Sequence, residues 1–393
     1  MKKVEIKPLD VLFFRDSRPM GGSFKGRGEN FPMPHTFNGA LRSAIQSDGT
    51  DFFTVGPFLK KSDEIYFQTP GDLILNGSNS NNSESSNVMR ISPLEGNYYT
   101  NLPNGMKPIG SSGIVETKEK LGNFISSSDF EKYLRNESLN PSSFKTNSDF
   151  YAIENNFGIA IDKLTNIAVE QKFFTKNTIR LKDNVSFVGL MRDSKDYPEH
   201  TYIRFGGEAR YSDCRVEDIS KSILPVPPEI TGNRVKFVLL TPAIFVQQQD
   251  HPGGWLPNWV NHNDNSVTIL DGPGAAKARR MRAKGIKVSE GSPIKAKLVG
   301  AKINRAIAVS GIATGNGMRK SCGEKATLMA VPAGSVYYFE GENETEAQKL
   351  AKVLNWNSGS SNCLEVKNVR SMLLGEKGYG IGACTTWTYS NLE

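Results

Sequence analysis

The chain opens with alternating apolar and polar residues that give way to a continuous apolar run. Residues 4–9 alternate and residues 11–14 are all apolar, a pattern typical of a strand that enters a protein core. A similar apolar strand appears at 235–245. Far along the chain from each strand, a glycine-rich turn leads into another strand, at 202–216 and at 374–389. The pattern therefore predicts an internal repeat of two similar units.

The length of 393 residues fits two domains of about 150 to 200 residues each. A proline-rich stretch closes the first unit, so we predict domains at 1–230 and 231–393. An Asn- and Ser-rich stretch and weak patterns after it predict an insertion at about 76–150 in the first domain. The best helical signal in that insertion lies at 129–135.

Two other segments carry apolar residues at helical spacing. One covers 34–45, with Phe37 and Leu41 on its apolar face, and the other covers 344–354. Strand patterns surround both helices, including those at 168–174 and 185–190. The mixture predicts an α+β fold in each domain.

Composition narrows the kind of partner and the compartment. A net charge of +7 and a pI near 9.0 favour polyanionic partners. The four cysteines are far apart and form no CxxC pair, which argues against a zinc knuckle or a disulfide scaffold and indicates a reducing, cytoplasmic setting. The chain shows no apolar signal core and no run of eighteen apolar residues, so we expect it to be neither exported nor bound to a membrane.

The glycine-rich run near the C-terminus is the first candidate for a binding site. Glycines permit positive φ angles and close approach of a ligand to backbone N–H groups, which is how such loops hold a phosphate. Lys377 adds a positive charge and Tyr379 adds a ring on which a base could stack. The alternative is a glycine-rich turn without any ligand.

Two basic segments and one helix add further cations. Residues 15–28 form a glycine-rich basic loop, and Arg42 lies off the apolar face of the first helix. From 277 to 305 the chain carries ten Lys or Arg residues against the single acid Glu290. So uneven a run favours contact with phosphate over a merely solvated face.

Groups for catalysis are sparse. None of the four histidines has metal-ligand spacing, and the chain lacks a phosphate-binding GxxxxGK[ST], a GxGxxG and a GxSxG motif. We therefore expect no enzyme activity, metal or cofactor. His35, beside the basic loop, leaves one alternative open, which is metal-independent acid–base cleavage of RNA.

Several segments, taken together and in order, resemble one family. The chain is similar to the RAMP-superfamily subunit of type III-B CRISPR effector complexes, the third protein of the Cmr module. The segments that carry the resemblance are 6–19, 37–45, 240–245, 253–257, 330–339 and 375–382. The Asn- and Ser-rich stretch at 76–87 departs from the family pattern.

The resemblance implies two tandem ferredoxin-like (RRM-like) domains and a noncatalytic role in antiviral defence. It implies that the chain holds the 5′ repeat-derived handle of the CRISPR RNA. The protein partners it implies are the large cyclase- or polymerase-type subunit and the backbone RAMP subunits, with target RNA contacted only indirectly. We expect one cleft lined by RNA-binding residues, namely Arg15, Arg18, Lys25, Arg27, His35, Arg42, Arg204, Arg210, Lys277, Arg279, Arg280, Arg282, Lys377, Gly378, Tyr379, Gly380 and Gly382.

Three alternatives stay open at this point. The first is a CRISPR repeat-processing endoribonuclease that uses His35. The second is the type III-A counterpart subunit, which would share nearly all of this chemistry. The third is a purely structural assembly protein whose basic surface faces an acidic partner.

Overall fold

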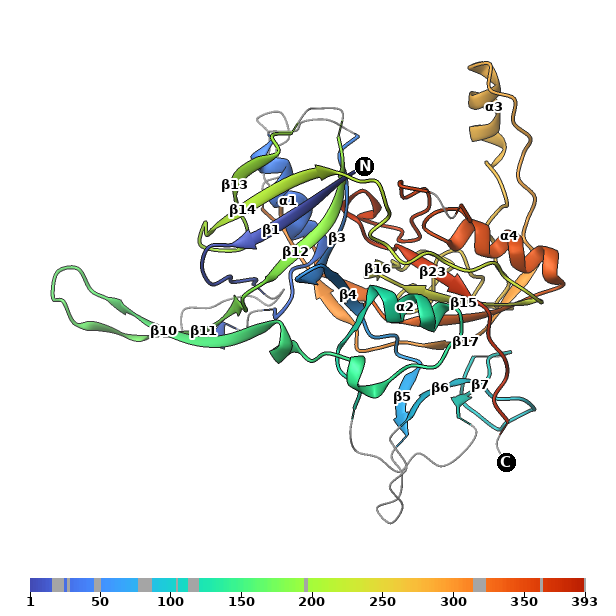
Figure 1. Ribbon diagram of the computed structural model, residues 1–393, viewed down its shortest axis with the longest axis horizontal. Helices are drawn as coiled ribbons and strands as arrows, with labels where there is room; N and C mark the ends of the chain where they lie inside the picture. Colours follow the sequence, from blue (N-terminus) through green and yellow to red (C-terminus); the bar gives the residue numbers. More distant parts are fainter. Residues whose placement is uncertain are drawn as a thin grey trace, which may run out of the picture.

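The computed structural model describes residues 1–15, 25–26, 29–45, 51–76, 87–103, 105–111, 120–193, 197–313, 323–360 and 363–391. It is a mixed α/β structure with extensive sheets and few helices (Figure 1). Arg18 and Arg27 lie outside the described residues, and only the backbone of Lys25 is described. Within the described part, no helix has the length and apolar character needed to cross a membrane.

The first half is built on a seven-stranded sheet in which all neighbouring strands are antiparallel. Helix α1 (Pro34–Ala44) packs Phe37 and Leu41 against this sheet, in a core with Val4, Ile6 and Phe187. The sheet order is β13 (His200–Arg204), β14 (Tyr211–Asp218), β1 (Lys2–Pro8), β12 (Val185–Arg192), β3 (Phe53–Lys61), β4 (Glu64–Gln68) and β9 (Phe124–Ser126).

The second half is built on a four-stranded antiparallel sheet. Helix α4 (Glu344–Leu354) is capped by Asn343, whose side chain accepts a hydrogen bond from the backbone N–H of Glu346, and it buries Ala347 and Leu350. The sheet order is β17 (Ala296–Lys302), β22 (Val336–Gly341), β15 (Arg234–Leu239) and β23 (Gly382–Thr385).

The two sheets contain the same arrangement. Four strands of the first sheet lie in the order β14-β1-β12-β3, and those of the second sheet lie in the order β23-β15-β22-β17. Numbered along the chain within each set, both orders are fourth, first, third and second strand. Helix α1 connects the first and second strands of the first half, whereas α4 connects the third and fourth strands of the second half. The strand order therefore agrees with the internal repeat that the hydrophobic pattern predicts.

The halves also share a core. Val55 and Leu190 from the first sheet belong to the same buried cluster as Val238, Val336 and Ile381 from the second half. Burial of apolar surface is the main favourable term in folding, so this shared cluster fixes how the halves lie against each other.

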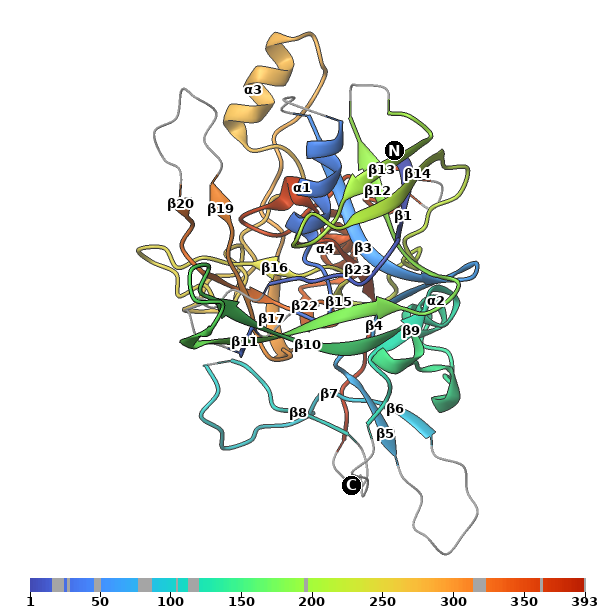
Figure 2. The same ribbon diagram turned by 90° about the vertical axis from the view of Figure 1, so that its left-hand side faces the viewer.

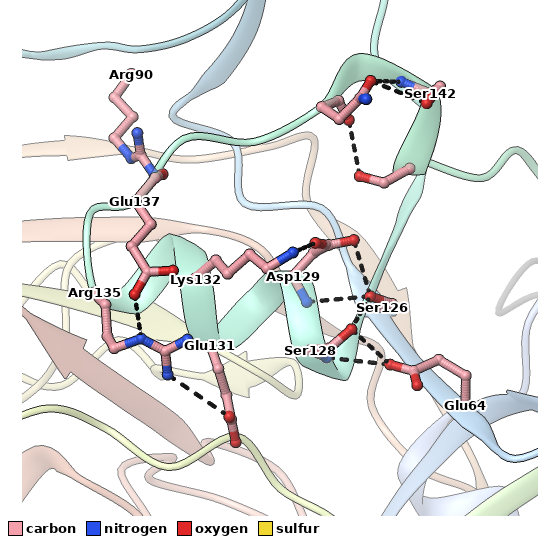
Figure 3. A network of polar contacts seen from close by, with 12 residues as sticks. Glu64, Arg90, Ser126, Ser128, Asp129, Glu131, Lys132, Arg135, Glu137 and Ser142 are labelled. Carbon is pink, nitrogen blue, oxygen red and sulfur yellow. Dashed lines mark hydrogen bonds and ion pairs between the residues drawn. The ribbon is translucent and has the colours of Figure 1, made fainter.

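Helix α2 (Ser127–Leu134) lies where the sequence predicts a helix, and polar contacts tie it to the first sheet (Figure 3). The Ser126 hydroxyl accepts a hydrogen bond from the backbone N–H of Asp129 at 3.1 Å, which caps the helix. The Glu64 carboxylate of β4 accepts bonds from the N–H and hydroxyl of Ser128 at 3.1 and 3.2 Å. The predicted insertion is thus partly built into the body of the molecule.

Two segments protrude from the body in Figure 1. One is the long hairpin of β10 (Tyr151–Ile161) and β11 (Ala168–Leu181), and the other is an arm that carries α3 (Ala275–Ala283). The remaining short elements are β2 (Lys25–Gly26), β5 (Leu73–Asn76), β6 (Asn87–Arg90), β7 (Ser92–Pro93), β8 (Ile109–Gly110), β16 (Ala243–Ile244), β18 (Ile307–Val309), β19 (Ile312–Ala313), β20 (Gly323–Glu324), β21 (Leu328–Val331), η1 (Pro141–Ser143), η2 (Asn147–Asp149) and η3 (Gly375–Lys377).

Candidate nucleic-acid interface

The C-terminal glycine loop lies at the junction of the two halves. Gly378 has a φ of +87° and packs so closely on β3 that a Cβ there would lie 2.6 Å from the carbonyl oxygen of Thr54. Gly380 has a φ of +79°, and its N–H donates to the carbonyl oxygen of Pro242 at 2.7 Å. A loop of the second half thus meets the first half through backbone contacts that only glycine permits.

Tyr379 points into the protein between these two glycines. Its side chain is fully buried and packs in a cluster with Ile244, Val309 and Ala330. The expectation that its ring stacks on a base does not fit this burial. The Tyr379 hydroxyl instead lies 2.7 Å from Nδ1 of His35 on α1, so the side chain positions the histidine.

A cluster of positive charges surrounds this loop. Burial lowers the pKa of Lys377, and the nearby charges of Lys325 and Arg42 lower it further, while Glu376 acts in the opposite direction. Lys325 follows β20 and Arg42 lies on α1, so three separate parts of the chain supply the three cations. Like charges held together raise the free energy of the site, and a bound anion would relieve that cost.

His35 borders the same cluster. Burial lowers its pKa to about 4, and the charges of Lys377 and Lys325 contribute to this shift. The imidazole is therefore neutral at neutral pH, and its bond to the Tyr379 hydroxyl holds the ring in place. A neutral, oriented imidazole next to cations is suited to hydrogen-bonding a bound group.

The low pKa of His35 predicts a pH-dependent stability. The unfolded chain has the ordinary histidine pKa of about 6.5 and binds the proton more tightly than the folded chain, so stability falls as the pH drops from about 6.5 towards 4. Between pH 7 and pH 5 this group should remove about 2 kcal/mol of unfolding free energy. Urea unfolding of the wild type and of His35→Asn across this range measures the difference, since the variant keeps a polar partner for Tyr379 but cannot titrate. Parallel pH profiles for the two proteins would contradict the assignment.

The other predicted cations lie elsewhere. Arg210 on the β13–β14 connection forms an ion pair with Asp10 and a second with Glu208 at 3.4 Å, and the Arg204 guanidinium lies 5.7 Å from the centre of the Tyr211 ring. Acidic neighbours thus already compensate the charge of Arg210. Arg15 is exposed and directly follows the buried Phe14.

The basic helix α3 stands away from the glycine loop on its own arm (Figures 1 and 2). It carries Lys277, Arg279, Arg280 and Arg282, and Arg282 pairs with Glu290 of the same arm at 3.1 Å. The structure therefore does not bring these residues into one cleft with the loop.

Gly382 has a packing role instead of a place on the loop surface. It lies in β23, where a Cβ would come within 2.3 Å of the Phe237 ring.

The sequence-predicted residues that the structure brings together are His35, Arg42, Lys377, Gly378, Tyr379 and Gly380. Sequence reasoning missed Lys325, which lies 52 positions before Lys377 and reaches the loop only through the fold.

Comparison with models of protein families identifies the family of this chain. The model of the family described as CRISPR-associated protein (Cas_Cmr3) matches residues 4–387. The chain belongs to this family. The match confirms the family predicted from the sequence motifs, the Cmr3-type RAMP subunit of type III-B systems. The comparison with curated protein sequences found no match.

Solved structures of CRISPR complexes contain chains similar to this Cmr3-family protein. Two are type III-B Cmr-beta complexes bound to cognate target RNA, one of them also with AMPPnP, and each matching chain is 14% identical over 86% of both chains, with TM-scores of 0.46 and 0.45. A third is a Csm3-Csm4 subcomplex of a type III-A interference complex, with 11% identity, coverage of 87% of this chain and 94% of that chain, and a TM-score of 0.36.

Proposed function

We propose that this chain is a noncatalytic RNA-binding subunit of a type III-B effector complex and that it holds the 5′ handle of the CRISPR RNA. The observation that carries this proposal is the cluster of Lys325, Lys377 and Arg42 at a glycine loop, because three cations from separate parts of the chain come together there and a bound anion would offset their mutual repulsion. Family membership supports a CRISPR RNA as the source of that anion.

Two tandem ferredoxin-like units would form the scaffold. Their support is the recurring strand order, with the last strand beside the first and the third beside the second, in both antiparallel sheets. In this arrangement the RNA-binding loop comes from the second unit and α1 from the first, so RNA is gripped at the seam between the units. Docking to the large cyclase-type subunit and to a backbone RAMP subunit is part of the proposal through the family resemblance.

Within the site, the cations would neutralise a phosphate while His35 donates or accepts one oriented hydrogen bond. Contacts to phosphate fix the position of a nucleic acid, whereas contacts to base edges read its sequence. The cluster therefore accounts for affinity and register, and a separate surface has to read the bases.

Replacing Lys377 with glutamine should weaken binding of a handle-bearing RNA and lower the slope of log affinity against log salt by about 1. The cause is the loss of one phosphate contact and the counterion it releases. Fluorescence anisotropy at several salt concentrations measures both quantities.

Lys352→Gln is the matched control, since Lys352 is an exposed lysine of α4. An unchanged slope in Lys377→Gln would remove the cluster from the proposal.

Charge reversal at Arg279 and Arg280 in the same assay decides whether the α3 arm takes part in RNA binding. RNA products formed without metal and lost in His35→Ala would instead support the endoribonuclease alternative.

A further inference from the structure

A pocket of about 730 Å³ lies far from the glycine loop. Its walls come from the end of β6, the start of β15 and the segment 386–391 that follows β23. Strand β6 and the C-terminus lie at the end of the molecule away from α1 in both views (Figures 1 and 2). None of the residues that line this pocket belongs to the cationic cluster at the loop, so the two sites are separate.

The charged residues that line the pocket are all cations. They are Arg90 of β6 and Arg234 and Lys236 of β15, and no Asp or Glu occurs among the described residues of its walls. Lys236 is paired with Asp72 at 2.9 Å, and Arg234 is paired with Glu340 at 3.4 Å. Arg90 has no carboxylate partner among the residues that the structure describes. The pocket therefore offers one cation, Arg90, to a ligand.

The Arg90 guanidinium is held in place, but its hydrogen-bonding groups are not all used. Its Nη2 donates to the carbonyl oxygen of Glu137, and the group lies 5.8 Å from the centre of the Tyr133 ring. Its Nε is shielded from water and has no hydrogen-bond partner in the described part of the chain. An unmade bond of this kind costs free energy, which an acceptor from a ligand would recover. A carboxylate matches the planar guanidinium because it can accept two parallel hydrogen bonds.

The other polar groups of the walls are mostly neutral amides and hydroxyls. The Asn136 amide donates to the Thr386 hydroxyl at 3.2 Å, and the hydroxyls of Ser92 and Ser390 lie 2.7 Å apart. Such groups can donate to or accept from a peptide backbone. A nucleic acid brings closely spaced phosphates and needs several cations, whereas one available guanidinium fits a single carboxylate.

We propose that this pocket binds an Asp or Glu side chain from an acidic segment of a protein partner, with the Arg90 guanidinium as its counterion. Charge complementarity selects the carboxylate, and the surrounding amides and hydroxyls bond the peptide groups on either side of it. The inference does not rest on the proposed function. It adds a protein-docking site at the end of the molecule away from the candidate nucleic-acid interface.

The test titrates the full chain with two blocked tripeptides, Gly-Glu-Gly and its neutral counterpart Gly-Gln-Gly. The chain is labelled with fluorotryptophan and observed by fluorine NMR. Trp387 lines the pocket, so its resonance, identified with Trp387→Phe, reports binding. The Glu peptide should shift this resonance saturably, and the Gln peptide should bind about tenfold or more weakly, because a charge-assisted hydrogen bond is lost.

Arg90→Gln should reduce the affinity for the Glu peptide by about tenfold or more and abolish the preference for Glu over Gln. Arg215→Gln is the matched control, since Arg215 is an exposed arginine of β14 that does not line this pocket. It removes the same charge from the chain and should leave both affinities unchanged.

A second pair of variants leaves the Arg90 site intact. Thr388 is an exposed residue of the pocket wall, so its replacement disturbs no core. Thr388→Glu places a competing carboxylate in the pocket and should weaken the Glu peptide by about tenfold. Thr388→Gln has nearly the same shape without the charge and should bind within about twofold of the wild type.

The outcomes decide the proposal. Equal affinity of the wild type for the two peptides, or an unchanged preference for Glu in both Arg90→Gln and Thr388→Glu, would overturn it. Tighter binding of inorganic phosphate or of a short RNA at the Trp387 resonance would also overturn it, because the site would then be a phosphate site. Thermal unfolding identifies a variant that misfolds, and the Thr388 pair decides if Arg90→Gln does so. The salt dependence of RNA binding at the glycine loop is unaffected by any of these results.

Discussion

Replacing Asp72 with alanine should lower the free energy of unfolding by about 3–5 kcal/mol. Asp72 is fully buried, and its carboxylate lies 2.9 Å from Nζ of Lys236, which is also buried. It also accepts a hydrogen bond from the Tyr133 hydroxyl at 2.8 Å. Burial lowers the pKa of Lys236 and the Asp72 charge opposes that shift, so removing the carboxylate leaves a cation in the core without its counterion.

This pair joins three parts of the molecule. Asp72 directly precedes β5, Lys236 lies in β15 of the second sheet, and Tyr133 lies in α2, with the Lys236 Nζ 4.4 Å from the centre of the Tyr133 ring. The loss should therefore loosen the contact between α2 and the second sheet as well as lower global stability. Urea unfolding followed by tryptophan fluorescence measures the global effect.

Two variants control the interpretation. Asp72→Asn combined with Lys236→Met removes both charges and should recover much of the lost stability, because no uncompensated charge then remains in the core. Asp218→Ala removes an exposed carboxylate that lies 3.9 Å from Lys2, and it should cost less than about 1 kcal/mol. A cost below about 1 kcal/mol for Asp72→Ala would show that the pair contributes little.

Strands with a strong local pattern could be predicted from the sequence. The stretches at 4–14 and 235–245 lead into the cores of both halves, and the pattern at 344–354 coincides with α4, because each segment buries one regular face. The pattern at 168–174 marks β11, but the sequence did not reveal its partner β10. Only Tyr151, the first residue of β10, is buried, because the rest of the hairpin stands off the body (Figure 1).

The region from 76 to 150 contains elements that local sequence patterns do not predict. Strand β9 has only three residues, too few for a period to be recognised, yet it extends the first sheet beside β4. Its residues Phe124 and Ile125 are buried because of long-range neighbours. Tertiary packing, which a single sequence does not display, decides the structure of such short elements.

The residues of the candidate site could also be predicted only in part. Lys377 and the loop glycines stand next to each other in the sequence, so their shared chemistry could be inferred. Lys325 could not, because only the fold brings it to the loop. Tyr379 was assigned to the wrong environment, since an aromatic residue between glycines is equally compatible with a stacking surface and with a buried anchor.

Replacing Gly380 with alanine should both destabilise the protein and weaken RNA binding. At its φ of +79° a side chain costs about 1–2 kcal/mol. An added Cβ would also lie 2.0 Å from the backbone nitrogen of Ser371, which cannot rotate away, and overpacking of this kind costs about 1–3 kcal/mol. We therefore expect a total loss of about 2–5 kcal/mol in urea unfolding.

Gly359→Ala separates the conformational cost from the steric one. Gly359 has a nearly identical φ of +81°, and no atom lies within 4 Å of a Cβ at that position. That variant should lose only about 1–2 kcal/mol and bind RNA like the wild type, since it leaves the loop in place. In Gly380→Ala the displaced loop should carry Lys377 and Tyr379 away from α1, so RNA affinity should fall even in the fraction that remains folded. Equal costs in the two variants, with equal RNA affinity, would mean that close backbone packing at Gly380 does not hold the binding loop.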